Sequence, residues 1–532
     1  MLSFNGEYSY LPTISLFMQP ILMVMVLSLL VVYIYNFNQI YNTFQGMGLP
    51  GPAPRFFFGN LIELFSHSRH SAACLSDWTK KYGKIYGYFI GHTPIICISD
   101  PDVLQEIFIT KFSYFHSRRP LPLQQEDLRH LLAAKGDEWK RQRSIIHPTF
   151  GPNKLKEMQA TIEKCINELL DKLDNQTVDI EFDISPLLKR TSMNIILNCA
   201  FGINPNKNEK LTESFFRRCS QVFEFSIFQN TLSICSMLMP ELNFVWVTCF
   251  KYVNIFRLWL CSHIPLMNRF IDTDPNTWLL YHVENVIKQR CLHGIEKIDL
   301  LQSMIDATDV VQKMSPSSTL SKYRLNLDEL LNNIYLFMIG GYETTATTLD
   351  YLMYVLATHP KEQTHLQNEL DKVYDDYEQL TKLEYLDCFI RETLRLYPIA
   401  PFIVNRQCNR ECQIGQVKIA KGTNLAVDMF SIHYDEKLYG PVSPFQFYPE
   451  RFLEKRHPLA WLPFGVGPRN CVGMRFAMLE IKLALAKILH RYTILSGERT
   501  VSQFAEQERF VIGPKNGIWI RLQLRENETT VK

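Results

Sequence analysis

Apolar residues recur every three or four positions over most of the chain, and this is the spacing of helices that bury one face. The clearest segments of this kind are 154–173, 186–200 and 383–396. β-Branched and aromatic residues instead fill 85–99 and 413–427, and glycines interrupt both segments, so each is predicted to form a short hairpin. The pattern therefore predicts a mainly α-helical protein with small β-sheets.

The longest helical pattern starts after Asn326 and ends before His359 and Pro360. Asn326 is a typical N-cap residue, and Glu329, three residues later, completes the sequence pattern of a capping box. His359 precedes a proline, which disfavours helical backbone at that position. At about 1.5 Å per residue, a helix of this length crosses a whole domain, so we expect it to be buried on several sides.

Two adjacent glycines interrupt the middle of this helix. Gly340 and Gly341 each cost about 1 kcal/mol relative to alanine in a helix interior, and Glu343 and Thr344 follow them. One interpretation is local: the glycines admit a neighbouring helix, and threonine bonds back to the preceding turn. The other is that the helix opens beside a ligand, with an acid and a hydroxyl placed to move protons. The helix alone leaves both interpretations open.

The N-terminal part of the chain carries a long uncharged apolar segment, residues 16–35. About 20 such residues span a bilayer as a helix. No basic segment precedes them and no small-residue cleavage site follows, so a membrane anchor is favoured over a cleaved signal peptide. Prolines in 49–60 then favour a stiff, extended connector. We predict four parts: an N-terminal segment with a transmembrane anchor (1–35), a linker with a proline-rich hinge (36–60), one large domain (61–525) and a polar tail (526–532).

Composition and charge exclude several classes of protein. The 532 residues are 46% hydrophobic and 21% charged, so the chain can bury a large core and is not disordered. The formal net charge is +2 and basic residues are interspersed with acids, so nucleic acid is not expected as a partner. The thirteen cysteines form no C-x-x-C pair, which indicates reduced thiols in a domain that faces the cytosol.

One cysteine, Cys471, stands between glycines in the stretch PFGVGPRNCVGMRFAMLE (463–480). Such a cysteine can be half of a disulfide, a zinc ligand, a nucleophile or the axial thiolate of a heme iron. Gly467 and Gly473 permit a tight loop, and the apolar stretch beyond is predicted to be a helix that begins near Val472. Backbone donors and the positive end of that helix favour a thiolate over a thiol. No further Cys or His follows at zinc-finger spacing.

The fixed residues of this loop are Phe464, Gly467, Arg469, Cys471 and Gly473, and they spell F-x-x-G-x-R-x-C-x-G. This pattern resembles the heme-binding signature of the cytochromes P450. Four further stretches resemble motifs of that family in its order along the chain, namely WKRQR (139–143), GGYETT (340–345), ETLR (392–395) and PERF (449–452). The anchor and hinge are similar to those of microsomal, animal-type members.

The resemblance implies the cytochrome P450 fold, a helical heme-thiolate domain over 61–525 behind the anchor, with heme b (iron protoporphyrin IX) as the cofactor. Cys471 is then the ligand of the iron, and Phe464 packs on the side of the sulfur. Arg469, Trp139 and Arg143 are implied to bind the heme propionates, because a buried anion needs charge-assisted donors.

The same resemblance assigns roles to two other groups of residues. Glu343 and Thr344 are implied to be catalytic and to relay protons to dioxygen at the heme. Glu392, Arg395 and Arg451 are implied to form a buried ion cluster that holds the segment beneath the heme, which is a structural role.

Two positions depart from the family pattern. The arginine that the family places after the ETLR helix is displaced by one residue, to Arg406, with Asn405 in its usual place, so Arg406 receives no role. The stretches WKRQRSIIHPTF and GPRNCVG loosely resemble animal family 4, whose members often carry a glutamate that esterifies heme at the position of Gly340. That bond cannot form here, and fatty-acid ω-hydroxylation does not follow.

The implied activity is a monooxygenase that inserts one atom of O2 into an apolar organic substrate. Electrons are expected from NADPH through NADPH-cytochrome P450 reductase, with cytochrome b5 as a further donor, and the implied location is the endoplasmic reticulum membrane with the catalytic domain facing the cytosol. The substrate pocket is implied to be lined by 114–132, 223–239, 401–404 and the Gly340 face of the long helix. Two alternatives stay open: a heme-thiolate isomerase or dehydratase that needs no external electrons, and a membrane heme or ligand binder without turnover.

Overall fold

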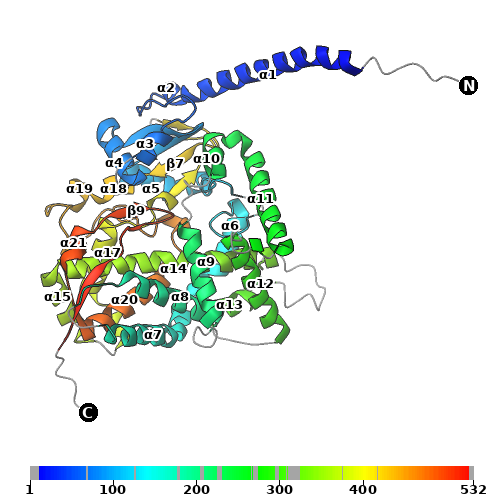
Figure 1. Cartoon of the computed structure of the whole chain (residues 1–532). Coiled ribbons are helices and arrows are strands. Elements are labelled where there is room, and N and C mark those ends of the chain that lie inside the picture. Colours follow the sequence, from blue (N-terminus) through cyan, green and yellow to red (C-terminus); the bar gives the residue numbers. More distant parts are fainter. Residues whose placement is uncertain are drawn as a thin grey trace, which may run out of the picture.

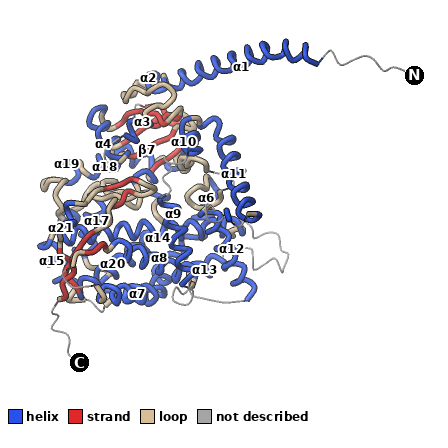
Figure 2. The backbone as a smooth tube through the Cα atoms, in the orientation of Figure 1, coloured by secondary structure: helices blue, strands red, loops and turns tan. Residues whose placement is uncertain are grey.

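The computed structural model describes residues 11–66, 70–124, 128–176, 180–203, 209–224, 231–264, 266–267, 274–293, 299–306, 308, 324–373, 376–415 and 417–525. The predicted tail 526–532 lies outside these residues. Helices dominate the body and four small sheets lie among them (Figures 1 and 2). The predicted fold class, mainly α with small β-sheets, is confirmed.

The helices are α1 (Leu11–Tyr41), α2 (Thr43–Gly46), α3 (Leu61–Ser66), α4 (Ser71–Tyr82), α5 (Pro101–Gln105), α6 (Gly136–Ile146), α7 (Pro152–Asp174), α8 (Ser185–Phe201), α9 (Glu209–Glu224), α10 (Thr231–Leu238), α11 (Asn243–His263), α12 (Pro275–His293), α13 (Leu300–Asp306), α14 (Leu327–Thr358), α15 (Pro360–Leu370), α16 (Tyr377–Leu380), α17 (Glu384–Leu396), α18 (Met429–His433), α19 (Glu436–Tyr439), α20 (Met474–Arg491) and α21 (Glu498–Ser502). The short helical turns η9 (Pro401–Ile403), η10 (Pro449–Phe452) and η11 (Gly467–Arg469) matter for the site.

The strands are β1 (Ile85–Ile90), β2 (Thr93–Ile98), β3 (Phe182–Asp183), β4 (Asn405–Gln407), β5 (Cys412–Ile414), β6 (Val417–Ile419), β7 (Asn424–Val427), β8 (Tyr492–Leu495), β9 (Glu506–Glu508), β10 (Ile512–Pro514) and β11 (Trp519–Leu524). The largest sheet has the order β1-β2-β7-β4.

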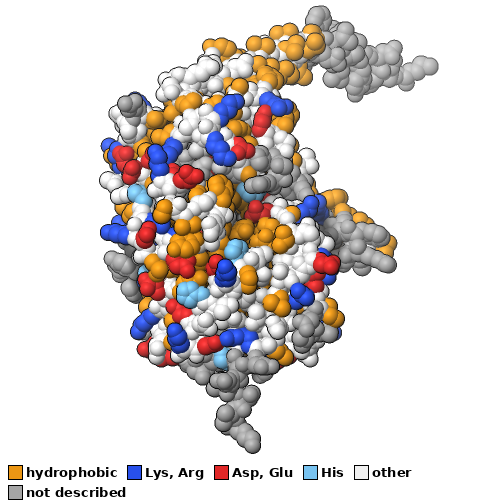
Figure 3. Space-filling model, turned by 90° about the vertical axis from the view of Figure 1, so that its left-hand side faces the viewer, with side chains coloured by type: hydrophobic (Ala, Val, Ile, Leu, Met, Phe, Trp, Pro, Cys, Tyr) orange, Lys and Arg blue, Asp and Glu red, His pale blue; other side chains and the backbone are white. Residues whose placement is uncertain are grey.

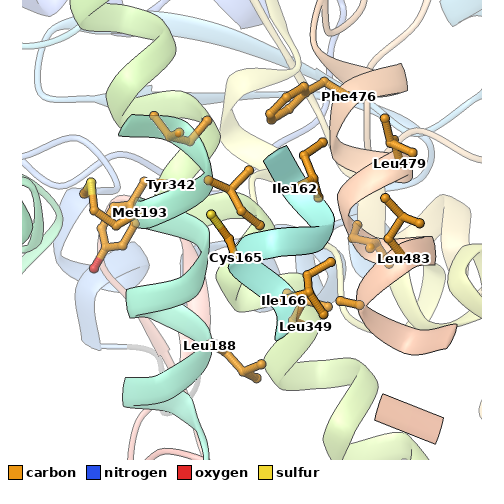
Figure 4. Close-up of a cluster of buried hydrophobic side chains, with 14 of the residues drawn as sticks. Ile162, Cys165, Ile166, Leu188, Met193, Tyr342, Leu349, Phe476, Leu479 and Leu483 are labelled. Carbon is orange, nitrogen blue, oxygen red and sulfur yellow. The ribbon is translucent and has the colours of Figure 1, made fainter. Parts of the chain in front are cut away.

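Helix α14 runs through the middle of the body, and the predicted helices at 154–173, 186–200 and 383–396 are confirmed as α7, α8 and α17. The expected capping box forms at the start of α14, where the Asn326 side chain accepts from the Glu329 N–H and Glu329 accepts from the Asn326 N–H. Side chains of α7, α8, α14 and α20 interlock in the core that Figure 4 shows, among them Ile162, Tyr342 and Leu479. This core fixes the middle of α14 relative to α20.

The predicted hairpin at 85–99 is confirmed, because β1 and β2 pair antiparallel from Ile85 with Ile98 to Ile90 with Thr93. The prediction for 413–427 is wrong in part. β5 and β6 do form a hairpin, but β7 leaves it and pairs in parallel with β2 and antiparallel with β4. Pairing in parallel with so distant a strand depends on the tertiary fold, which a local pattern does not report.

The N-terminal helix α1 projects from the body (Figure 1) and continues past the expected anchor to Tyr41. It extends because Phe37 stacks on His92 at 4.6 Å and Tyr41 meets Phe89 edge-on at 5.0 Å, between ring centroids. Figure 3 shows apolar side chains gathered on the projecting helix, whereas the body on that face mixes acids and bases. The division into parts at residues 35 and 60 stays a prediction.

Candidate functional site

The loop that carries Cys471 lies between η11 and α20. The Cys471 N–H donates to the Phe464 carbonyl over 2.8 Å, which closes the loop. Gly467 has a φ of +70°, and a side chain there would collide with the carbonyl of Phe108, so this position requires glycine. The Phe464 ring meets Trp461 at 5.8 Å between ring centroids. The loop therefore presents the Cys471 side chain, which is exposed.

The protonation of Cys471 differs from the expectation. Although the thiol is accessible, many protein atoms surround it, and this burial raises its pKa. The Gly473 N–H and the cations Arg143 and Arg118 oppose the rise without cancelling it. Helix α20 begins at Met474, later than expected. The polypeptide by itself therefore favours the thiol, and an iron bound at the sulfur would supply the further positive charge that stabilises the thiolate.

Arg469 is buried beside this loop. Its guanidinium donates to the carbonyl oxygens of His116 (2.8 Å) and Ala134 (2.5 Å) and lies 4.4 Å from the centre of the Trp139 ring. Arg143 donates to the Asn470 carbonyl over 3.0 Å and to its side-chain oxygen over 2.8 Å. Three residues expected at a propionate site thus meet at one side of the cysteine loop.

Two further arginines, which the sequence did not assign, lie in the same cluster. Arg118 donates to the carbonyl oxygens of Arg469 (3.0 Å) and Ile403, and Arg406 is fully buried with its guanidinium 4.2 Å from the centre of the Phe108 ring. The Nε atoms of Arg118 and Arg406 are buried and have no hydrogen-bond partner. No sequence pattern indicated Arg118, whereas Arg406 stood out only as the displaced arginine of the family pattern and received no role; the fold brings the two together.

These four arginines lack acidic partners among the described residues. Burial lowers the pKa of Arg118 to about 10 and that of Arg469 to about 8, and repulsion from neighbouring arginines adds to both shifts. Within the described part of the chain, no ion pair joins Arg118, Arg143, Arg406 or Arg469 to an acid. A buried group of cations with unused donors fits a ligand that carries two carboxylates, such as a heme with its propionates.

The two glycines of α14 have different surroundings. A methyl group on Gly341 would collide with the Ile196 side chain of α8, whereas one on Gly340 would meet nothing within 4 Å. Gly340 is exposed although it lies in the middle of a long core helix. Gly341 therefore admits a neighbouring helix, and Gly340 borders an open space. The contact at Gly341 agrees with the packing interpretation, and the open space beside Gly340 leaves room for a ligand without any break in the helix.

Thr344 and Glu343 point to different partners. The Thr344 hydroxyl donates to the Gly340 carbonyl over 2.6 Å, so it lies on the open side of α14, and the backbone there stays helical. The Glu343 carboxylate is nearly buried and pairs with Lys189 of α8, 2.7 Å away. The structure thus places the hydroxyl at the open space and the acid in an ion pair toward α8.

The buried ion cluster contains one acid and two bases. Glu392 accepts from Arg395 through both oxygens, over 2.7 and 2.8 Å, and from Arg451 Nε over 2.8 Å. All three side chains are almost completely buried. Arg395 also donates to the His433 carbonyl over 2.7 Å, so the cluster ties α17 to α18 and η10. These contacts agree with a structural role.

The sequence of this chain matches a known protein family. A family model described as Cytochrome P450 matches residues 49–521. The chain belongs to the cytochrome P450 family. The nematode protein CYP13A2 of Caenorhabditis elegans is 32% identical over 483 residues, covering 87% of this chain and 90% of that protein. Cytochrome P450 3A12 of the dog, Canis lupus familiaris, is 30% identical over 521 residues, covering 95% and 96%.

Membership makes this chain a P450 monooxygenase with a heme-thiolate iron centre. A further relative, cytochrome P450 3A13 of the mouse, Mus musculus, is 29% identical over 515 residues. The resemblance to animal P450s is confirmed, while the looser likeness to family 4 rests on two short stretches and stays a prediction. The donor set fits the implied cofactor, since Cys471 offers one sulfur and the arginine cluster offers unused donors for anions.

Proposed function

We propose that this P450 binds heme b and inserts one oxygen atom of O2 into an apolar organic substrate, with electrons from NADPH delivered by NADPH-cytochrome P450 reductase. One arrangement carries the proposal. Cys471 is presented by a closed loop, the four arginines at one side of that loop form no ion pair with an acid among the described residues, and Gly340 of the central helix borders an open space.

We assign the residues as follows. Cys471 would bind the iron, and Arg118, Arg143, Arg406 and Arg469 would hold the propionates. Heme, when bound there, supplies the activation of dioxygen by an iron that carries a thiolate ligand. Trp139 would hold the Arg469 guanidinium in place through a cation–π contact, at 4.4 Å from the ring centre. Phe464 closes the loop through its carbonyl.

The proton-relay role proposed for Thr344 and Glu343 rests on position. The Thr344 hydroxyl lies on the open side of α14, where it can hold a proton beside dioxygen. Glu343 is one residue away and pairs with Lys189, whose side chain is 28% exposed. We propose that Glu343 exchanges protons with solvent along this pair and passes them to the Thr344 hydroxyl.

An apolar substrate is supported by the aromatic side chains near α14. Phe223 of α9 lies 6.1 Å from Tyr342 and 5.6 Å from Phe510, and Phe510 lies 5.3 Å from Phe402 of η9, all between ring centroids. Phe510, in the β9–β10 turn, was not expected from the sequence. These rings make the surroundings of α14 apolar, which favours an apolar substrate. Residues 225–230 of the expected lining run 223–239 lie outside the described residues.

We further propose attachment to the endoplasmic reticulum membrane through two helices, with the catalytic domain in the cytosol. The described part of the chain contains two segments that could span a bilayer by length and composition, Pro20–Tyr41 with a mean hydropathy of 2.2 and Pro240–His263 with 1.2. The first supports the anchor. The second includes α11, which exposes Phe244, Phe256 and Trp259, while Phe223 and Leu238 of the nearby run 223–239 are buried. We therefore assign the second membrane contact to α11.

Reconstitution with NADPH-cytochrome P450 reductase, lipid vesicles and 18O2 tests the function. We expect substrate-dependent consumption of NADPH and products that carry a single 18O atom, first with steroids, terpenoids and fatty acids as candidate apolar substrates. Addition of cytochrome b5 tests it as a further donor. Conversion of a lipid hydroperoxide without NADPH, together with no 18O in any product, would instead indicate the isomerase alternative.

A further inference from the structure

Two cysteines that the proposed function does not use bracket a short turn near the arginine cluster. Cys408 follows β4, Cys412 opens β5, and three residues separate them. All thirteen cysteines lie in the described part of the chain, and all are free thiols. Cys408 is buried in the core cluster around Phe108, and Cys412 is partly exposed and packs against that cluster. One thiol is therefore shielded and the other is reachable from solvent.

The turn brings the Cys408 thiol beside the strand that pairs with Cys412. The Cys408 thiol donates to the Arg410 carbonyl over 3.0 Å and lies 4.0 Å from the Ile419 carbonyl. Ile419 is the antiparallel partner of Cys412, and such partners have Cα atoms about 4.5 to 5.5 Å apart. Each thiol shifts the pKa of the other, so the two side chains lie close together. A disulfide joins Cα atoms about 4.4 to 6.8 Å apart, and a bond here requires the turn to bring Cys408 and Cys412 within that range.

The turn is fastened to the segment that supplies Arg118. The Asn409 N–H donates to the Tyr114 carbonyl over 2.7 Å. The Asn409 side chain accepts from the Ser117 N–H over 3.1 Å and donates to the Ser117 hydroxyl over 2.6 Å. Ser117 immediately precedes Arg118 in the chain. A change in the turn between Cys408 and Cys412 therefore acts on Asn409, and through it on the position of Arg118.

We propose that Cys408 and Cys412 form a reversible disulfide that loosens the Arg118 segment and weakens retention of the cofactor. The oxidant is hydrogen peroxide. The Cys412 sulfur attacks one peroxide oxygen and becomes a sulfenic acid while the O–O bond breaks and one water leaves. The Cys408 sulfur then displaces the sulfenic oxygen as a second water. Two thiols and one peroxide thus give one disulfide and two waters, and a dithiol reductant reverses the change.

The surroundings of the two thiols slow their oxidation. Burial raises the pKa of Cys408 to about 11, and burial also raises that of Cys412, which Lys111 opposes. Because the thiolate is the reactive form, oxidation is slow at neutral pH and faster as pH rises. The pair is therefore expected to respond to sustained oxidant.

Tryptic mapping of the full-length holoprotein tests the bond directly. Trypsin cleaves after Arg406, Arg410 and Lys418, so Cys408 and Cys412 fall in separate peptides, 407–410 and 411–418. After exposure to peroxide and alkylation of free thiols, we expect these two peptides to migrate as one linked species that separates on reduction. The exposed Cys249 should remain alkylated. Separate, alkylated peptides 407–410 and 411–418 after prolonged exposure at pH 9 would overturn the proposal.

Transfer of heme to apomyoglobin tests the consequence, and this arm rests on the proposed heme site. Diamide serves as the oxidant here because it takes two electrons and two protons from two thiols without attacking heme. We expect a several-fold faster transfer from oxidised wild-type protein, reversal by dithiothreitol, and no effect of diamide on the Cys412→Ser variant. A linked peptide with unchanged heme transfer would overturn the coupling to Arg118. Absence of heme from the untreated protein would instead contradict the proposed function.

Discussion

The Nε2 atom of His433 accepts a hydrogen bond of 3.2 Å from the backbone N–H of Leu462. Its Nδ1 atom lies 3.0 Å from the Arg395 carbonyl and therefore donates to it, since a neutral imidazole has one donor and one acceptor. His433 thus connects the Glu392 cluster to Leu462. The buried imidazole therefore links the ion cluster to the segment that precedes the cysteine loop in the chain.

Replacement of His433 by Gln is expected to change how stability depends on pH. Burial, with repulsion from Arg395, lowers the pKa of His433 to about 3 in the folded state, while an unfolded histidine has a pKa of about 6.5. Between these values the unfolded chain binds the extra proton, so the free energy of unfolding falls as pH falls from about 6.5 toward 3, by up to about 1.4 kcal/mol per unit. Urea unfolding at several pH values should show a shallower slope in His433→Gln. Equal slopes would mean that His433 is not neutral in the fold.

The adjacent glycines Gly340 and Gly341 are expected to respond oppositely to alanine. Gly341→Ala collides with Ile196 and should destabilise the protein by about 1 to 3 kcal/mol. Gly340→Ala meets open space, so it should stabilise the helix by up to about 1 kcal/mol and narrow the range of bulky substrates. Thermal unfolding and substrate-binding spectra measure the two effects. Similar destabilisation by both variants would show that no open space adjoins Gly340.

Thr344→Ala removes the hydroxyl from the open side of α14. Heme content and substrate affinity should stay unchanged, while a larger share of the consumed NADPH should appear as hydrogen peroxide, because dioxygen has lost a nearby proton donor. Thr345→Ala is the matched control, since that side chain is buried and lies about 100° further round the helix. If the share of NADPH that ends in product is unchanged in Thr344→Ala, the Thr344 hydroxyl has no role in proton transfer and serves only to bond to the preceding turn of the helix.

Deletion of residues 1–35 is expected to release only part of the protein from membranes. The apolar side chains that α11 exposes remain after this deletion, among them Phe256 at 57% and Trp259 at 50% exposure. Adding Phe256→Ser and Trp259→Ser to the deletion should release the rest, because interfacial binding scales with the apolar area that is buried. Flotation on vesicles of phosphatidylcholine measures both steps. Complete release by the deletion alone would show that α11 does not contact the membrane.

Local chemistry was predictable from the sequence where it depends on neighbours in the chain. The Asn326 capping box, the bounds of α7 and α8, and the loop of glycines around Cys471 were all found because each pattern spans a few residues. Arg118 was missed and Arg406, though noticed, received no role, because the significance of both comes from meeting Arg469 in space. His433 was missed for the same reason.

Two further results depend on contacts between distant parts of the chain, which local sequence patterns do not predict. The pattern at 424–427 indicates a strand, but its parallel pairing with β2 arises from the tertiary fold. The glycines and helix end near Cys471 favour a thiolate locally, yet surrounding protein raises the pKa of the thiol. In both cases the local sequence indicates a real feature, a strand or a group that stabilises a thiolate. Contacts with distant parts of the chain then decide the pairing of the strand and the pKa of the thiol.

The difference spectrum of the reduced protein with carbon monoxide tests the central claim most directly. We expect wild-type protein and Cys412→Ala to show the red-shifted absorption of a heme carbonyl with a thiolate opposite, because both keep the Cys471 sulfur. Cys471→Ala should lose that absorption entirely. A Cys471→Ala protein that still shows the thiolate-type carbonyl spectrum would contradict the assignment of Cys471 as the iron ligand.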